Sequence, residues 1–305
     1  MYRKIFLLSA FALIVTGCET ISTEENKPAI INAQRGQGLP FEVIGSQVWD
    51  IADPLSNRTY QIYVSLPSSY TRNQDRKYPT LYVTDANYAF PIINQLRRRV
   101  NGLEDFILIG LSYNKGEDGG LSRRRDYTPT TKGAIDAPPK AIYGGAKHYM
   151  EYIKSEIIPF VEKKYRSDPA RRVYAGHSYG GLFGANVMLN DPSLFSGYIL
   201  GSPSLWYDDR YTFKREEEYS KNNTDLNANV FMFIGEYEQA GLGDPKDPNR
   251  YNMVTDTYDF EKILIERKYP SLKIKSEVLN DEDHNTIAPR GFTHALKYFF
   301  QEKTK

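Results

Sequence analysis

Short apolar runs alternate with longer amphipathic stretches along most of the chain. The short runs predict strands at residues 41–51, 59–66, 78–84, 106–111, 173–175, 196–200, 230–234 and 272–278. Apolar residues spaced three or four positions apart predict helices at residues 143–165, 179–189, 258–268 and 286–300. The run at 59–66 alternates apolar and polar positions, whereas 78–84 and 106–111 are compact apolar runs, as in strands buried on both faces.

The order of these elements predicts the fold class. Strands that alternate with helices form a mostly parallel sheet covered by helices on both faces. No internal repeat is visible between Gly38 and the C-terminus, and no second linker interrupts that stretch. We therefore expect residues 38–305 to form one α/β domain.

The N-terminus has a different pattern. Arg3 and Lys4 precede an apolar run at residues 5–15, which is too short to cross about 30 Å of hydrocarbon as a helix. The run instead suits the apolar part of a secretory signal. The sequence VTGC at residues 15–18 closes this run and resembles the lipobox of bacterial lipoproteins. In those proteins, cleavage precedes a lipid-modified cysteine.

That resemblance implies a signal peptide at residues 1–17, followed by a lipidated Cys18 and a polar tether at residues 18–37. Acyl chains on Cys18 would hold the protein on a membrane, because each buried methylene group contributes ~0.8 kcal/mol. Glu19 is not the aspartate that is linked with inner-membrane retention in enterobacterial lipoproteins. We therefore expect a cell-envelope protein anchored in the outer membrane of a Gram-negative bacterium. A plain secreted protein with an incidental Cys18 is the alternative.

Composition excludes several classes of protein. The chain of 305 residues is 40% hydrophobic and 25% charged, which suits a soluble globular protein and not a disordered or multi-span membrane chain. With 39 basic and 38 acidic residues, the protein has no overall positive field that would attract nucleic acid. A single cysteine excludes disulfide bonds within the chain and zinc sites built from several thiolates. The 24 tyrosines suit either an aromatic binding surface or strands.

The sequence GHSYGG at residues 176–181 is the strongest indication of chemistry. It follows the predicted strand at 173–175 and opens the predicted helix at 179–189. A Gly-x-Ser-x-Gly motif in that position is typical of the strained turn that carries the nucleophile of α/β-hydrolases. The helix that starts after Ser178 also offers free backbone N–H groups to a developing oxyanion. An ordinary serine on a surface turn is the alternative.

A serine nucleophile needs a base, and in this fold the acid and then the histidine follow the serine along the chain. Two histidines lie after Ser178. His284 stands in the polar segment DEDHN between the last predicted strand and the last predicted helix, which suits a catalytic base. His294 lies within the predicted helix and suits a packed or surface residue.

The supporting acid should follow the predicted strand at 230–234. The sequence there is GEYE at residues 235–238. Glu238 is the first candidate, because a carboxylate on the turn after the strand can reach the imidazole and fix its tautomer. Glu236 is the alternative.

Further motifs show a likeness to a known family. The stretch from 143 to 207 resembles the esterase D or putative esterase family of α/β-hydrolases, and within it the esterases that cleave trilactone siderophores. The motifs that carry this resemblance are GGA at 144–146, IPF at 158–160, YRSDP at 165–169, GHSYGGLF at 176–183 and GSPSLW at 201–206. The segments YPTLYVTD at 78–85, GEYE at 235–238 and HN at 284–285 fit the strand before the oxyanion loop and the acid and base positions.

The resemblance implies an α/β-hydrolase fold and a serine mechanism that needs no metal or organic cofactor. It makes Ser178 the nucleophile, His284 the base and Glu238 the supporting acid. It places the oxyanion donors on the backbone N–H of Tyr179 and in the turn at Ala86. The family usually has glycine where this chain has Ala86, and some siderophore esterases resemble serine–histidine dyads that lack the acid.

Candidate substrate contacts are Trp206 and Arg125. Trp206 follows the SPSL run and is expected to line the pocket, as the resemblance implies, with a place in the core as the alternative. Arg125 belongs to the run RRRDY at 123–127, which is expected on a glycine-rich loop. There it could contact an anionic ferric catecholate or a sugar-linked aromatic acid. A solvated run of charges is the alternative for this segment.

The sequence thus predicts a lipid-anchored serine hydrolase that cleaves carboxylic esters through an acyl-enzyme. The expected substrate is a small-molecule ester of the siderophore trilactone type, which includes ferric siderophores. A carbohydrate-linked acetyl or feruloyl esterase is one alternative, and a ligand-binding lipoprotein of the same fold without turnover is another. A metallohydrolase is disfavoured, because the four histidines include no H-x-x-x-H pair.

Overall fold

The computed structural model describes residues 38, 42–133, 138–244, 247–248 and 250–302. The predicted signal peptide at 1–17, Cys18 and the tether at 18–37 lie outside the described residues. The chain divides into two units, Met1–Ile44 and Gly45–Lys305. In the first unit, the described residues 38 and 42–44 belong to no helix or strand. The second unit carries every element described below.

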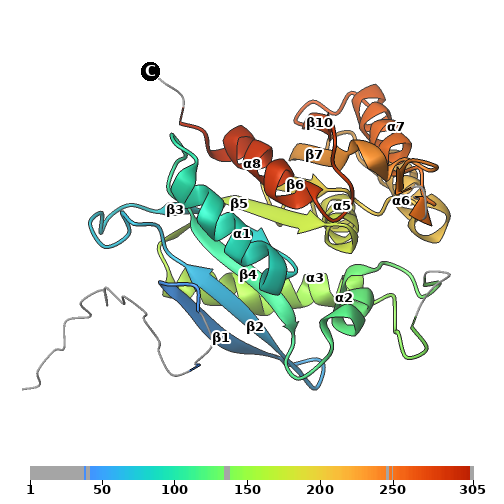
Figure 1. The fold of residues 1–305 in the computed structure, drawn as a ribbon. Helices are drawn as coiled ribbons and strands as arrows, with labels where there is room; N and C mark the ends of the chain where they lie inside the picture. The colour runs from blue at the N-terminus through green and yellow to red at the C-terminus, as the bar shows by residue number, and fades with distance from the viewer. Residues whose placement is uncertain (1–37, 39–41, 134–137, 245–246, 249, 303–305) are drawn as a thin grey trace, which may run out of the picture. The chain divides into compact units, whose positions relative to one another are not determined.

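An eight-stranded sheet forms the centre of this second unit (Figure 1). Its strands in spatial order are β1 (Ser46–Asp53), β2 (Arg58–Ser65), β4 (Ile107–Asn114), β3 (Tyr78–Val83), β5 (Ser167–His177), β6 (Gly197–Gly201), β7 (Asn229–Gly235) and β10 (Lys273–Leu279). Pairing is antiparallel from β1 to β2 and from β2 to β4, and parallel from β4 through to β10. The predicted mostly parallel sheet is therefore confirmed.

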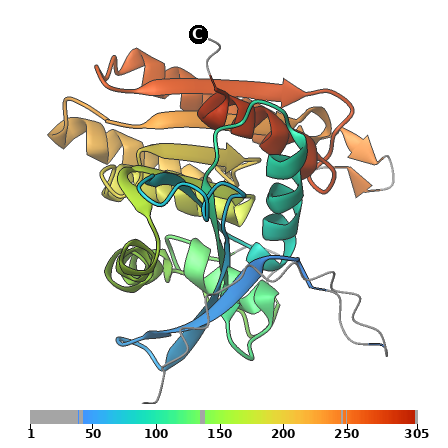
Figure 2. The ribbon, with the colours of Figure 1, turned by 90° about the vertical axis from the view of Figure 1, so that its left-hand side faces the viewer.

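Helices cover both faces of the sheet. Helices α1 (Ala86–Arg99) and α8 (Ile287–Phe300) pack against each other on one face (Figures 1 and 2). The other helices are α2 (Gly119–Tyr127), α3 (Ala146–Tyr152), α4 (Ile158–Lys164), α5 (Tyr179–Asn190), α6 (Tyr207–Asn222) and α7 (Met253–Glu266). Each of these six contributes side chains to one continuous hydrophobic cluster with the strands. No helix among the described residues is both long and apolar enough to cross a bilayer.

Many of the tyrosines pack inside the protein. Tyr174 on β5 is fully buried and lies against Phe183 of α5, with 5.9 Å between ring centroids. Tyr149 of α3 lies 5.5 Å from the same phenylalanine ring. Burying aromatic rings in this way contributes to stability beyond the area removed from water. The high tyrosine content is therefore largely a property of the core.

Several predicted elements differ from those observed. The strand predicted at 41–51 begins only at Ser46, and the helix predicted at 143–165 begins at Ala146 and contains a π-helical turn, η1 (Ile153–Ile157). Helix α1 was not predicted, because Pro91 interrupts its pattern. The segment 123–127, predicted as a glycine-rich loop, is the second half of α2. Asp118 caps that helix by accepting a hydrogen bond from Leu121 N–H, which explains why the glycines open a helix.

Candidate active site

Ser178 lies on the turn between β5 and α5, as the sequence predicts. Its backbone has φ 60° and ψ −119°, a conformation that residues other than glycine rarely adopt. Gly176 and Gly180 make this turn possible. A Cβ at Gly176 would lie 2.4 Å from the Gly180 carbonyl, and one at Gly180 would lie 2.5 Å from Thr84 Oγ1. The tight turn therefore requires glycine on both sides of the serine.

The backbone around Ser178 is held by the end of the next strand. The Ser178 N–H donates to the carbonyl of Gly201 at 2.9 Å. Tyr179 is the first residue of α5, and N–H groups in a helix's first turn have no acceptor within the helix. The N–H of Tyr179 has no acceptor in the part of the chain that the structure describes, and it is therefore open to an oxyanion. The Oγ of Ser178 lies 3.5 Å from that of Ser204.

His284 lies on the loop between β10 and α8, and its imidazole is held by Glu238. The Nδ1 of His284 is 2.5 Å from Oε2 of Glu238. Because an ionised carboxylate can only accept, Nδ1 carries the proton and Nε2 is left as the basic nitrogen. Glu238 itself is fully buried. This is the relationship that orients a general base in serine hydrolases.

The second oxygen of Glu238 is also satisfied. Its Oε1 accepts hydrogen bonds from Ser202 Oγ at 2.6 Å and from Gly235 N–H at 2.8 Å. Glu236, the alternative acid, instead accepts from the N–H of Asp281 at 3.1 Å. The structure therefore brings Glu238, and not Glu236, to the histidine. His294, the other downstream histidine, lies in α8 and pairs with Glu277 on β10 at 2.7 Å.

His177 is a member of this site that the sequence analysis did not single out. Its ring lies against that of His284, with 4.6 Å between centroids and 40° between planes. Its Nε2 is buried and has no hydrogen-bond partner among the described residues. Burial, with His284 and Arg123 nearby, lowers the pKa of His177 well below its ordinary value. His177 is therefore a neutral neighbour of the base.

A pocket of about 490 Å³ opens at Ser178 and His284. Its lining residues are Ser178, Ser204, Trp206, Tyr237, Leu242, Gly243, Tyr251, Met253, Asp283, His284 and Asn285. Trp206 therefore lies where the sequence predicts, in the pocket wall. Its ring stacks on that of Tyr251, with 3.8 Å between centroids and 8° between planes. A stacked aromatic pair therefore forms part of the pocket wall.

Arg125 does not line this pocket, and its predicted contact with substrate is wrong. The side chain is buried in α2, where its guanidinium pairs with Asp126 at 2.8 Å and with Glu117 at 2.6 Å. A buried cation that is paired on both sides is held in place by its partners. The helical period instead brings Arg123, two residues earlier, to the turn that carries Ser178. The Nη2 of Arg123 lies 3.5 Å from the carbonyl oxygen of His177.

Ala86 is the first residue of α1 and is fully buried. The N–H of the preceding Asp85 donates to the hydroxyl of Tyr127 at 3.3 Å. Within the described residues, the N–H groups of Ala86 and Asn87 have no acceptor, as expected at the start of a helix. The turn that the resemblance assigns to the oxyanion hole therefore has free donors. That the N–H of Ala86 donates to the oxyanion stays a prediction.

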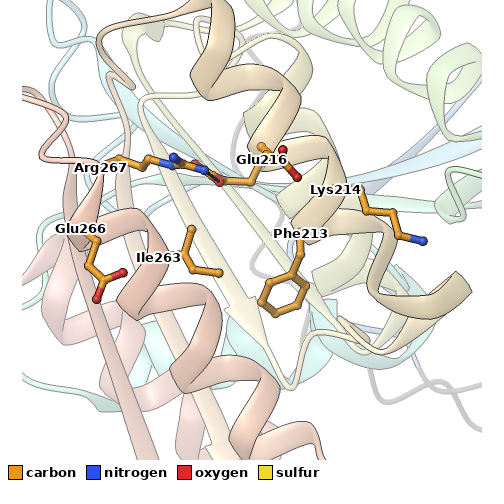
Figure 3. Close-up of a pocket in the computed structure, with 7 residues that line it drawn as sticks. Phe213, Lys214, Glu216, Ile263, Glu266 and Arg267 are labelled. Carbon is orange, nitrogen blue, oxygen red and sulfur yellow. Dashed lines mark hydrogen bonds and ion pairs between the residues drawn. The ribbon is translucent and has the colours of Figure 1, made fainter.

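A second pocket, of about 440 Å³, lies between α6 and α7 (Figure 3). Its lining includes Phe213 and Ile263, and Figure 3 shows Glu216 and Arg267 directed toward each other. These two groups form paired hydrogen bonds of 2.9 Å each. No serine, histidine or cysteine is among the described residues that line it. Across the part of the chain that the structure describes, no group of three or more potential metal ligands occurs either.

Comparisons with known proteins identify similar chains. The model of the family described as Putative esterase matches residues 54–257, a span that includes Ser178 and Glu238. The ferri-bacillibactin esterase of Bacillus subtilis is 28% identical over 278 residues, which cover 86% of this chain and 92% of that protein. The siderophore triacetylfusarinine C esterase of Aspergillus fumigatus is 29% identical over 275 residues, which cover 80% of this chain and 89% of that protein.

Solved structures give the same picture of the fold. The crystal structure of the BES protein from Bacillus cereus has a TM-score of 0.71 and 24% sequence identity, over 87% of this chain and 99% of that one. An IroE-like serine hydrolase from Shewanella oneidensis also has a TM-score of 0.71, with 22% identity, over 84% of this chain and 80% of that one.

Proposed function

The chain belongs to the family described as Putative esterase and is an ester hydrolase, and we propose that it cleaves the ester bonds of siderophores with Ser178 as the nucleophile. The fold is that of the α/β-hydrolases, as the sequence predicts. The observation that carries the proposal is the hydrogen bond between Glu238 and His284, because His284 lines the pocket that contains Ser178.

The first half of the reaction forms an acyl-enzyme. The Oγ of Ser178 attacks the ester carbonyl carbon while Nε2 of His284 takes the hydroxyl proton. The carbonyl oxygen becomes an oxyanion, which the N–H of Tyr179 and the free donors at the start of α1 stabilise. Glu238 stabilises the imidazolium that forms. When the tetrahedral intermediate collapses, the bond to the alcohol oxygen breaks and His284 returns the proton to that oxygen.

The second half releases the acid. A water molecule attacks the acyl carbon, and His284 takes one of its protons. The bond between the acyl carbon and Oγ then breaks, and the proton passes from His284 to Ser178. The neutral state of His177 favours this chemistry, because a second positive charge beside His284 would oppose formation of the imidazolium.

The siderophore substrate is supported by relatives and by the pocket. Proteins named as siderophore esterases in a bacterium and a fungus match most of this chain at 28% and 29% identity. The pocket volume of about 490 Å³ lies in the usual range for small-molecule sites. The Trp206–Tyr251 stack provides a face on which an aromatic group of the substrate can lie.

The test is hydrolysis of a trilactone siderophore by the purified full chain, followed by chromatography of the products. Ferric and metal-free trilactones are compared with acetyl and feruloyl esters of sugars, and Ser178→Ala is assayed in parallel. We expect serine-dependent opening of the trilactone to be at least about 100-fold faster, as kcat/KM, than cleavage of the sugar esters, a difference of about 2.7 kcal/mol. Preferential cleavage of the sugar esters would contradict the siderophore substrate and indicate an esterase that acts on carbohydrate-linked acids.

We also propose that the protein is attached to the outer membrane of a Gram-negative bacterium through lipid on Cys18. The support is the apolar run at 5–15, which ends in VTGC with the chain's single cysteine in last place. The polar segment at 18–37 would then separate the hydrolase from the membrane surface.

A further inference from the structure

Asp85 occupies the N-cap position of α1 but does not cap the helix. An aspartate there usually accepts a hydrogen bond from an N–H of the first turn. In this protein the Asp85 side chain makes no such bond, and its backbone has φ 53° and ψ 46°. Among the described residues, the N–H groups of Ala86 and Asn87 consequently have no acceptor, and they lie in the turn assigned above to the oxyanion hole.

The Asp85 carboxylate is drawn away from the helix by Arg123 of α2. Nε of Arg123 lies 2.9 Å from Oδ1, and Nη2 lies 3.2 Å from Oδ2, so the contact is bidentate. Tyr113 of β4 donates its hydroxyl to Oδ1 at 2.7 Å. The pair is mostly buried, with 21% of the Arg123 side chain and 11% of the Asp85 side chain exposed. Bidentate pairs of this kind fix direction as well as distance.

Arg123 also contacts the other side of the predicted oxyanion hole. Its guanidinium lies 5.3 Å from the ring centroid of Tyr179, whose N–H is the second predicted donor. Its Nη2 lies 3.5 Å from the carbonyl oxygen of His177. One side chain therefore connects the turn before α1 with the turn before α5, and these two turns carry the two sets of free N–H groups.

Without Arg123, the carboxylate would lose the partner that directs it away from the helix. The free N–H groups at the start of α1 and the positive end of its dipole attract an anion. A carboxylate that rotated to cap the helix would use the donors that the reaction's oxyanion needs, and would place a negative charge beside it. A pocket of about 240 Å³, lined in part by Asp85, Arg123 and His177, leaves space around the pair.

We propose that Arg123 is a positioning residue that keeps the Asp85 carboxylate out of the oxyanion hole. The inference rests on the proposed function of Ser178. It assigns Arg123 a part in transition-state stabilisation that acts through Asp85 and not through contact with substrate.

The test measures kcat and KM separately on a small activated ester, so that the result does not depend on the siderophore assignment. Arg123→Met should lower kcat by about 100-fold or more, which is the effect of losing one oxyanion donor, and change KM by less than about 3-fold. Arg124→Met is the matched control on the same helix, because its guanidinium bonds the Gly120 carbonyl of its own helix at 3.0 Å. It should stay within about 2-fold of the wild type.

Rescue separates this role from a merely structural one. Asp85→Gly tolerates the positive φ and removes the carboxylate, so the double variant Arg123→Met, Asp85→Gly should recover kcat to within about 10-fold of the wild type. A folded double variant that is as slow as Arg123→Met would overturn the proposal.

A second variant covers the case in which Arg123→Met does not fold. Tyr113→Phe removes the other donor to Asp85 and keeps the ring, so it should lower kcat by about 3- to 10-fold at constant KM. An unchanged kcat in Tyr113→Phe together with an inactive, unfolded Arg123→Met would also overturn it. Failure of the proposed function is distinct, because the wild type would then show no Ser178-dependent hydrolysis.

Discussion

Glu238 holds His284 by a hydrogen bond of 2.5 Å between Oε2 and Nδ1, although the two residues lie on loops that follow different strands. Strands β7 and β10 are parallel neighbours, so the loops after their carboxyl ends meet at one edge of the sheet. The turn after β5, with Ser178, lies at that same edge. The parallel sheet therefore assembles the site from three distant segments of the chain.

The hydrogen bond from His284 to Glu238 should be needed for full activity. Glu238→Gln removes the charge that stabilises the imidazolium and presents an amide that can select the wrong tautomer, so kcat should fall by about 100- to 10,000-fold. Glu236→Gln is the matched control, since Glu236 bonds the backbone of Asp281 and not the histidine. Steady-state kinetics on a simple ester measures both. Equal losses in the two variants would contradict a distinct role for Glu238.

The free energy of unfolding should depend on His177 below neutral pH. The pKa of His177 is lowered by burial and by the neighbouring His284 and Arg123, whereas an imidazole in the unfolded chain titrates near 6.5. Below that pH the unfolded chain takes up a proton that the folded chain excludes. The contribution of His177 to the free energy of unfolding is therefore fully present above the pKa of the unfolded chain. It is lost as the pH falls below that value, by up to about 1.4 kcal/mol per pH unit.

The variant His177→Gln has no such proton to take up, so its stability should fall less steeply with pH than that of the wild type. Urea unfolding at several pH values between 7.5 and about 5 measures the two slopes. Parallel curves of the free energy of unfolding against pH for the wild type and His177→Gln would contradict the prediction. They would show that His177 has the same pKa in the folded and in the unfolded protein.

The aromatic wall of the pocket should affect aromatic substrates more than small ones. Trp206→Ala removes one ring of the stack with Tyr251 on which an aromatic acyl group would lie. A contact between two aromatic rings contributes about 0.5–1.5 kcal/mol. The KM for an ester with an aromatic acyl group should therefore rise by about 2- to 10-fold, while that for an acetyl ester should change little. Trp49→Phe provides the control, because Trp49 lies on β1 and bonds Tyr165 instead of lining the pocket. Equal effects on both esters would contradict this role of Trp206.

Much of the fold and the core of the site follow from local signals in the sequence. The compact apolar strands fix the sheet, and the glycines around Ser178 fix the turn. His284 and Glu238 could be selected because each follows a predicted strand in the order that the fold requires. Such signals lie within a few residues of the position they specify.

Features that depend on distant partners could not be predicted. Arg123 and Arg125 stand in the same charged run, yet one pairs with Asp85 beside the site and the other with Glu117 and Asp126 in the interior. The choice depends on the helical period of α2 and on which face of it meets α5. His177 had a local signal, its position next to Ser178, but its stacking on His284 arises only in three dimensions.

Lipid attachment is tested at Cys18. Cys18→Ser should move the protein from the membrane fraction to the soluble fraction, because the acyl chains would be missing. Its specific activity should be unchanged, since Ser178, His284 and Glu238 all lie in the unit Gly45–Lys305. Fractionation followed by an ester assay measures both quantities. A Cys18→Ser protein that stays in the membrane fraction would contradict the anchor.

The most direct test of the central claim is to trap the nucleophile. The purified wild type is treated with a fluorophosphonate, and the modified peptide is identified by mass spectrometry while ester hydrolysis is followed in the same samples. We predict one adduct, on Ser178, whose formation parallels the loss of activity. Ser178→Ala should remain unlabelled and slower by about 10,000-fold or more. Labelling at another residue, or a Ser178→Ala variant that keeps more than about a tenth of the activity, would contradict the account.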